Sequence, residues 1–127
     1  MPKTDQPILV VDDDPFILDV VSRYLKAKGF RVLTTTDPER AYAMAESDVP
    51  RLIISDIAMP GLDGFTLVQG FKLNRLTCQT PLVFLTGSDK IDDIEKGFAI
   101  GAQAYLLKPL DWAVAWPKIE SFLKEQP

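Results

Sequence analysis

The stretch Ile8-Leu9-Val10-Val11-Asp12-Asp13-Asp14-Pro15 decides the fold. Four consecutive branched apolar residues are typical of a parallel strand that is buried on both faces. Asp14 and Pro15 supply an N-cap and a first-turn proline, which together predict the start of a helix. A buried strand followed directly by a capped helix begins a βαβ unit, so the stretch predicts an α/β fold with a parallel sheet.

The same alternation of apolar runs and helical patterns continues along the chain. Strands are predicted at 8–11, 31–36, 52–55, 82–85 and 104–107, and helices at about 15–28, 38–47, 64–74 and 91–100, with a fifth helix after Pro109. In the first helix we expect six residues to face the core: Phe16, Ile17, Val20, Val21, Tyr24 and Leu25. Five strands alternating with five helices predict one doubly wound sheet, whose ligand crevice lies outside the carboxyl ends of the strands.

The bulk composition fits one globular domain. A chain of 127 residues buries roughly two thirds of its unfolded surface, and 46% of the residues are hydrophobic and 25% charged. We expect a single domain over residues 1–127, with its core at about 7–124 and no effector domain in this chain. No apolar run approaches the roughly 20 residues that cross a bilayer, and residues 1–7 are too polar for a signal peptide, so we expect a cytoplasmic protein without membrane contact.

Charge and residue usage restrict the chemistry. Fourteen basic and eighteen acidic side chains give a net charge of −4, which disfavours nucleic acid as a direct partner. The chain has no histidine, and therefore lacks the commonest general base and metal ligand. Its single cysteine, Cys78, excludes an internal disulfide and is interpreted as an incidental thiol. Phosphate chemistry in this chain must therefore use carboxylates.

Reactive side chains are predicted at the carboxyl ends of four strands. They are Asp12 and Asp13 after the first strand, Asp56 after the third, Thr86 after the fourth and Lys108 after the fifth. A doubly wound sheet would gather them into one shallow site. Three carboxylates would repel one another unless a cation lay among them, and aspartate oxygens suit Mg²⁺. Helix capping is the alternative role for an acidic run, and we assign it to Asp14.

Lys108 and Thr86 extend the site beyond a metal cluster. A lysine facing three carboxylates is compatible with a plain salt bridge, but it also neutralises charge on a phosphoryl group in transfer. The hydroxyl of Thr86 can donate to a phosphoryl oxygen. An aspartate carboxylate is a competent nucleophile for phosphate, so Asp56 is the predicted covalent site.

At these positions the chain resembles the receiver domain of bacterial two-component response regulators, the CheY-like family. The resemblance covers Pro7 to about Lys124 and rests on four blocks in order and spacing: Val11-Asp12-Asp13-Asp14, Asp56-Ile57-Ala58-Met59-Pro60-Gly61-Leu62-Asp63-Gly64, Leu85-Thr86-Gly87 and Tyr105-Leu106-Leu107-Lys108-Pro109. It implies a five-stranded parallel sheet with strands in the order 2-1-3-4-5.

The resemblance also implies the roles of the site residues. Asp56 would be the phosphoacceptor, supplied by a sensor histidine kinase or a histidine phosphotransfer protein. Asp13 would bind Mg²⁺ directly and Asp12 directly or through water, with the backbone carbonyl of Ala58 as a further metal ligand. The Lys108-Pro109 peptide would be cis. The chain would catalyse its own phosphorylation and dephosphorylation without being a classical enzyme.

A switch is the next implication of the resemblance. Thr86 would move toward the phosphate and Tyr105 would turn inward, remodelling the surface made by the helix at 91–100, the strand at 104–107 and the fifth helix. That surface would contact a downstream effector domain or protein, or a second copy in a homodimer. Phosphorylation adds about −1.5 to −2 charge, which biases a two-state element. A packed aromatic at the sheet edge is the alternative interpretation of Tyr105.

The fifth helix departs from the expected pattern at residues 112–117, Trp-Ala-Val-Ala-Trp-Pro. An internal proline costs about 3 kcal/mol in a helix and disfavours the α region for the residue before it. We predict a kink near Trp116, or a regular helix only from Pro117. The apolar residues beyond it should face the core: Ile119, Phe122 and Leu123. Trp112 and Trp116 either fill the core or form a surface for a partner.

Three other classes of protein are compatible with parts of this pattern. A flavodoxin-like electron carrier needs phosphate-binding donors in its first loop, where the three aspartates would repel the phosphate. A phosphatase with an Asp-x-Asp motif needs a carboxylate at position 58, where alanine stands. A degenerate receiver, which binds partners without phosphorylation, remains the alternative.

Overall fold

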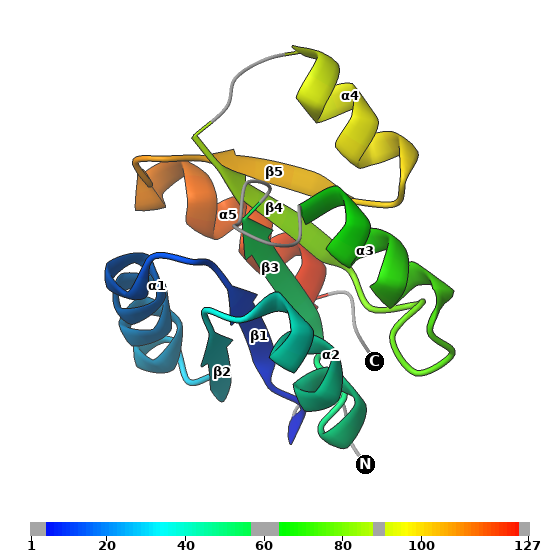
Figure 1. The fold of residues 1–127 in the computed structure, drawn as a ribbon. Coiled ribbons are helices and arrows are strands. Elements are labelled where there is room, and N and C mark those ends of the chain that lie inside the picture. The colour runs from blue at the N-terminus through cyan, green and yellow to red at the C-terminus, as the bar shows by residue number, and fades with distance from the viewer. Residues whose placement is uncertain (1–4, 57–63, 88–90, 125–127) are drawn as a thin grey trace.

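The centre of the molecule is a five-stranded parallel sheet (Figure 1). The computed structural model describes residues 5–56, 64–87 and 91–124. The strands are β1 (Ile8–Val11), β2 (Val32–Thr35), β3 (Leu52–Asp56), β4 (Leu82–Thr86) and β5 (Ala104–Leu107). They are ordered β2-β1-β3-β4-β5, and neighbouring strands run parallel. The predicted sheet and its strand order are confirmed.

Five helices alternate with the strands in the described part of the chain. They are α1 (Pro15–Ala27), α2 (Pro38–Ser47), α3 (Gly64–Leu73), α4 (Ile91–Ala99) and α5 (Trp112–Lys124). α1 and α5 pack on one face of the sheet, and α2 and α3 on the other (Figure 1). The order reverses at β1, which lies between β2 and β3, so the crevice expected at such a switch point lies beside the carboxyl ends of β1 and β3. No helix in the described part of the chain is long and apolar enough to cross a membrane.

Strand β1 shows why the sheet is buried on both faces. Ile8 and Val10 join the core cluster under α1 and α5, whereas Leu9 and Val11 join the cluster under α2 and α3. All four side chains are fully buried. Side chains of successive strand residues point to opposite faces, so an uninterrupted apolar run is what a two-sided core requires. Each such burial stabilises the fold by about 1.5–3 kcal/mol.

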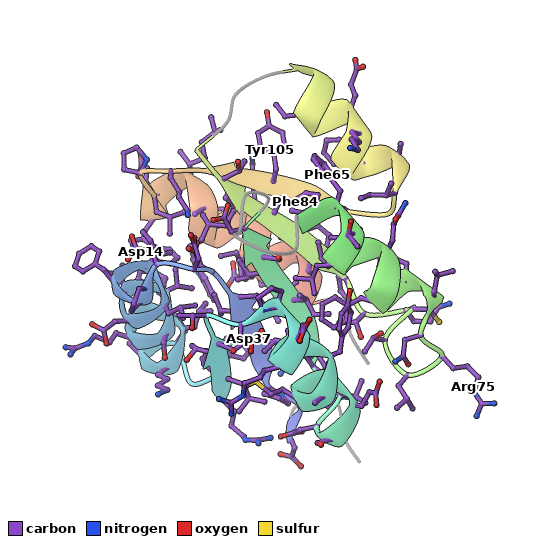
Figure 2. All side chains as sticks on the ribbon, viewed as in Figure 1. Asp14, Asp37, Phe65, Arg75, Phe84 and Tyr105 are labelled. Atoms are coloured by element: carbon purple, nitrogen blue, oxygen red, sulfur yellow. The ribbon has the colours of Figure 1, made fainter. Side chains whose placement is uncertain are left out.

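Two helices begin with the predicted aspartate and proline. The Asp14 carboxylate accepts a hydrogen bond of 2.9 Å from the Phe16 amide, and Asp37 accepts one of the same length from the Glu39 amide. Each aspartate precedes a proline in the first helical turn. Figure 2 shows both capping aspartates at the starts of their helices. The caps satisfy amides that have no partner within the helix.

The buried face of α1 differs in part from the prediction. Phe16 was expected inside but is 70% exposed. The buried positions are Leu18, Val21, Ser22 and Leu25. Their spacing of three, four and seven residues defines one helical stripe, and Phe16 lies outside it. The prediction for Phe16 was wrong because it rested on the apolar character of the residue and not on its position around the helix.

α5 is continuous through Pro117, so the expectation of a regular helix only from that residue is wrong. The first turn forms ahead of the proline because Asp111 caps it. The Asp111 carboxylate accepts from the Ala113 amide at 3.0 Å, and its carbonyl accepts from the Ala115 amide at 2.8 Å. A proline here removes one amide donor but leaves those bonds in place. The apolar residues beyond it pack inward as predicted: Ile119, Phe122 and Leu123.

Candidate functional site

The carboxyl ends of β1 and β3 bring three aspartates together. Val11 pairs with Ser55 in the sheet, so the next residues, Asp12 and Asp56, leave the two strands at the same level. Carboxylate oxygens of Asp12, Asp13 and Asp56 all lie within 4.8 Å of one another. Asp12 and Asp56 are buried, and Asp13 is exposed. The group is thus reached from solvent on the side of Asp13.

Asp12 is the most deeply buried carboxylate of the group, with no exposed surface. Its Oδ1 accepts a hydrogen bond of 2.9 Å from the Asp14 amide. Its Oδ2 lies 2.7 Å from Nζ of Lys108. Burial raises the pKa of Asp12, because removal from water disfavours the charged form more than Lys108 and the Asp14 amide favour it.

Lys108 reaches this group from the end of β5. Its Nζ lies 3.4 Å from Oδ2 of Asp56, so one ammonium contacts both Asp12 and Asp56. Its amide donates a 2.8 Å hydrogen bond to the Thr86 carbonyl, which holds the start of the β5–α5 connection against β4. Burial acts to lower the pKa of Lys108, but the hydrogen bond to Asp12 and the charge of Asp56 outweigh it and raise the pKa. The Lys108-Pro109 peptide is cis, as the resemblance implied.

Thr86 is the last residue of β4 and is buried. Asp56 is paired with Leu85, so Thr86 follows one position beyond Asp56 on the neighbouring strand. The arrangement places the Asp56 carboxylate, the Lys108 ammonium and Thr86 at neighbouring strand ends.

Tyr105 lies farther along the sheet, on β5. It pairs with Phe84 of β4, and its ring meets that of Phe98 of α4 edge to face at 6.1 Å. Nζ of Lys118 on α5 lies 5.5 Å from the ring centroid. Figure 2 shows Tyr105 with Phe65 and Phe84 at the part of the sheet between α3 and α4. Tyr105 therefore connects β5 with both α4 and α5.

The donor set fits a hard divalent cation. It offers oxygen atoms alone, from three carboxylates, which is the ligand type that Mg²⁺ prefers. Apart from the Lys108 ammonium, no donor in the described part of the chain reaches the buried Asp12 Oδ2. The predicted fourth ligand, the carbonyl of Ala58, lies outside the described residues.

One supporting contact was not foreseen from the sequence. Asp14 was assigned to helix capping alone, yet its amide also orients Asp12. The available signal was the spacing, because an aspartate side chain often accepts from the amide two residues ahead. Asp14 therefore supports both the cluster of three aspartates, through its amide, and the start of α1, through its side chain.

Comparison with known proteins agrees with this geometry. Residues 8–115 match the family model for the response regulator receiver domain. The chain is 36% identical over 117 residues to the DNA-binding dual master transcriptional regulator RpaA of Synechocystis, covering 92% of this chain and 48% of RpaA. It is 35% identical over 117 residues to the response regulator PleD of Caulobacter vibrioides, covering 92% of this chain and 26% of PleD. The chain thus spans about half the length of the first relative and about a quarter of the second.

Solved structures show the same fold. The chemotaxis protein CheY4 of Vibrio cholerae has a TM-score of 0.87 and 30% identity, covering 92% of this chain and 98% of CheY4. The BeF3-activated N-terminal receiver domain of Klebsiella pneumoniae RstA has a TM-score of 0.86 and 28% identity, covering 94% of this chain and all of that chain, 100%. With the match to the family model, these similarities establish that this chain belongs to the receiver domains of two-component response regulators.

Proposed function

We propose that Asp56 accepts a phosphoryl group from a phosphohistidine, carried by a sensor histidine kinase or a histidine phosphotransfer protein, with Mg²⁺ as cofactor. The observation that carries the proposal is the position of Lys108, whose ammonium contacts Asp12 and Asp56 at the edge of a three-carboxylate cluster. Metal ligation by itself does not require a lysine in this place. A nucleophilic carboxylate that receives a charged phosphoryl group does require a nearby cation.

The transfer uses the side chains of this chain directly. A carboxylate oxygen of Asp56 attacks phosphorus, and the phosphorus–nitrogen bond of the phosphohistidine breaks. The bonding electrons remain on the imidazole nitrogen of the donor. Lys108 neutralises charge on the transferring oxygens, and the Thr86 hydroxyl donates a hydrogen bond to one of them. Bound by Asp12, Asp13, Asp56 and the Ala58 carbonyl, Mg²⁺ would supply further positive charge next to the phosphoryl oxygens.

Loss of the phosphate reverses the bond change at Asp56. A water molecule attacks phosphorus, the bond from phosphorus to the Asp56 oxygen breaks, and inorganic phosphate leaves. The Asp56 carboxylate is regenerated as the leaving group. The chain thus acts on its own phosphorylation state.

The signal would leave through α4, β5 and α5. Phosphorylation adds charge and acceptor oxygens beside Thr86, and Tyr105 links β5 to Phe98 of α4 and Lys118 of α5. Movement of Thr86 and Tyr105 would change the surface offered to a downstream effector domain or protein, or to a second copy. We place this exchange in the cytoplasm, where histidine kinases phosphorylate their partners.

Intact mass tests the transfer. The protein is incubated with acetyl phosphate and Mg²⁺, and Asp56→Asn serves as the control. Wild type should gain a single phosphoryl group, and the variant none. The same adduct on the variant would place the phosphate elsewhere. A wild type that gains no adduct would contradict the proposal and favour a receiver that binds partners without phosphorylation.

Backbone amide shifts test the switch. On addition of beryllofluoride with Mg²⁺, changes should spread from Asp56 to Tyr105 and α5. Changes confined to the neighbourhood of Asp12 and Asp13 would contradict a signal through β5.

A further inference from the structure

A ring stack joins α1 to the first residue of α5. Tyr24 and Trp112 lie with their centroids 3.8 Å apart and their planes 1° from parallel. Both rings pack against the core cluster under α1 and α5. Stacked aromatic rings at this separation are in close contact over much of their area, which restricts how far the two helices slide past each other.

The stack lies just beyond the segment that carries Lys108. Lys108 directly follows β5, and its amide donates to the carbonyl of Thr86. Three residues later Asp111 caps α5, and Trp112 is the first residue of that helix. The β5–α5 connection is therefore held by the sheet at Lys108 and by the ring of Tyr24 at Trp112.

The position of Trp112, at the α5 end of the β5–α5 connection, matters because Lys108 makes close contacts with the carboxylates. The ammonium lies 2.7 Å from Asp12 and 3.4 Å from Asp56, at the end of a long and flexible side chain. α1 also follows directly on the aspartate run, and the Asp14 amide at its start binds Asp12. α1 is thus linked to Asp12 through the Asp14 amide at its start. It is linked to the connection that carries Lys108 through the stack of Tyr24 on Trp112.

We propose that the Tyr24–Trp112 stack is a positioning contact for Lys108 in phosphoryl transfer. In this role Trp112 contacts neither the phosphoryl group nor the metal ligands. It acts through the backbone between Lys108 and Asp111. The inference rests on the proposed role of Lys108 and Asp56. It assigns the two tryptophans of this helix different tasks, although both pack beside Tyr24.

Trp116 provides a matched control. It lies one helical turn farther from Lys108, and its ring is tilted against that of Tyr24 at 5.9 Å and against that of Phe30 at 6.3 Å. Trp116→Leu removes the same amount of side chain from the same cluster as Trp112→Leu. It leaves the first turn of α5 stacked on Tyr24.

The experiment compares phosphorylation by acetyl phosphate at saturating Mg²⁺ in wild type, Trp112→Leu, Trp112→Phe and Trp116→Leu. Displacement of a reacting group by an ångström costs up to about 100-fold in rate, so Trp112→Leu should be slower by roughly tenfold. Trp112→Phe, which keeps a ring on Tyr24, and Trp116→Leu should stay within about twofold of wild type. Mg²⁺ affinity by calorimetry should change little in every variant, because the aspartates and the charge of Lys108 are both retained.

A second readout does not depend on phosphorylation. The Lys108 amide is bonded to the Thr86 carbonyl, so its hydrogen exchange reports on the start of the connection. Relative to amides of β1, Lys108 should exchange faster in Trp112→Leu than in Trp116→Leu. Tyr24→Leu, which removes the opposite ring, should reproduce the effect and serves if Trp112→Leu does not fold.

The outcomes separate this inference from the proposed function. Wild-type phosphorylation with equal rates in the two leucine variants overturns the positioning role. A loss in Trp112→Phe as large as in Trp112→Leu also overturns it, because the ring is kept. A wild type that takes no phosphate contradicts the proposed function instead, and equal Lys108 exchange in the two leucine variants would then overturn the positioning role by itself.

Discussion

Lys108 and Asp12 form the closest ion pair of the site, with Nζ of the lysine 2.7 Å from Oδ2 of the aspartate. Asp12 is fully buried, and one of its carboxylate oxygens lies within 4.8 Å of oxygens of Asp13 and Asp56. The lysine would therefore share with a bound cation the carboxylate that lies deepest in the fold. A positive charge in this place favours a phosphoryl group and opposes a second cation.

Replacement of Lys108 by methionine should separate these two effects. Lys108→Met removes a positive charge beside the carboxylates, so we expect Mg²⁺ to bind about tenfold more tightly, equivalent to ~1.4 kcal/mol. Phosphorylation by acetyl phosphate should nevertheless slow by at least about 100-fold, because charge on the transferring group is no longer neutralised. Calorimetry and intact mass measure the two quantities. Lys26→Met, at an exposed position of α1, is the control, and weaker Mg²⁺ binding in Lys108→Met would contradict the prediction.

Mg²⁺ should stabilise the fold through Asp13. A ligand that binds only the folded state adds about 2.7 kcal/mol at 100 times its Kd. Asp13 is exposed, so Asp13→Asn should leave the metal-free protein close to wild type but remove most of the Mg²⁺-dependent rise in Tm. Asp14→Asn is the matched control, because asparagine retains the N-cap of α1. Equal Mg²⁺ responses in the two variants would argue against Asp13 as a ligand.

Tyr42 should make the free energy of unfolding fall at alkaline pH. Its hydroxyl donates to the Leu67 carbonyl at 3.1 Å, and burial raises its pKa. The folded state thus favours the neutral phenol, and this stabilisation is complete below the unfolded pKa of about 10 and lost as the pH rises through the higher folded pKa. Tyr42→Phe should cost about 1 kcal/mol at pH 8, and the difference should shrink at pH 11. Urea unfolding at both pH values checks this, and a constant difference would contradict it.

Pro117 should lower the stability of α5. Its side chain is exposed and it falls inside the helix, where proline lacks the amide that would bond the Ala113 carbonyl. Pro117→Ala should raise the free energy of unfolding by about 1–2 kcal/mol. This value already allows for the greater conformational freedom that alanine gives the unfolded chain. Pro15→Ala, at a first-turn position where no amide partner is needed, should not stabilise. Equal effects of the two changes in denaturant unfolding would contradict this explanation.

The sequence by itself determined which strand end carries each candidate site residue, and most of the helices and strands. The apolar run at 8–11 and the Asp-Pro pairs at 14–15 and 37–38 act locally, through burial on two faces and through capping, so their patterns predict structure directly. The positions of Asp12, Asp56 and Lys108 at strand ends followed from the same alternation. That they would converge was predictable because parallel strands present their carboxyl ends at one edge of a sheet.

Only the tertiary structure decided which side of a helix is buried, whether a proline interrupts it, and how closely Lys108 approaches each carboxylate. Phe16 is apolar but lies outside the stripe that α1 turns toward the sheet, and α5 crosses Pro117 because Asp111 secures its first turn. The contacts of Lys108 with Asp12 at 2.7 Å and with Asp56 at 3.4 Å connect residues from three different strand ends. Such contacts join residues far apart in the chain, and local patterns carry no information about the packing that sets their distances.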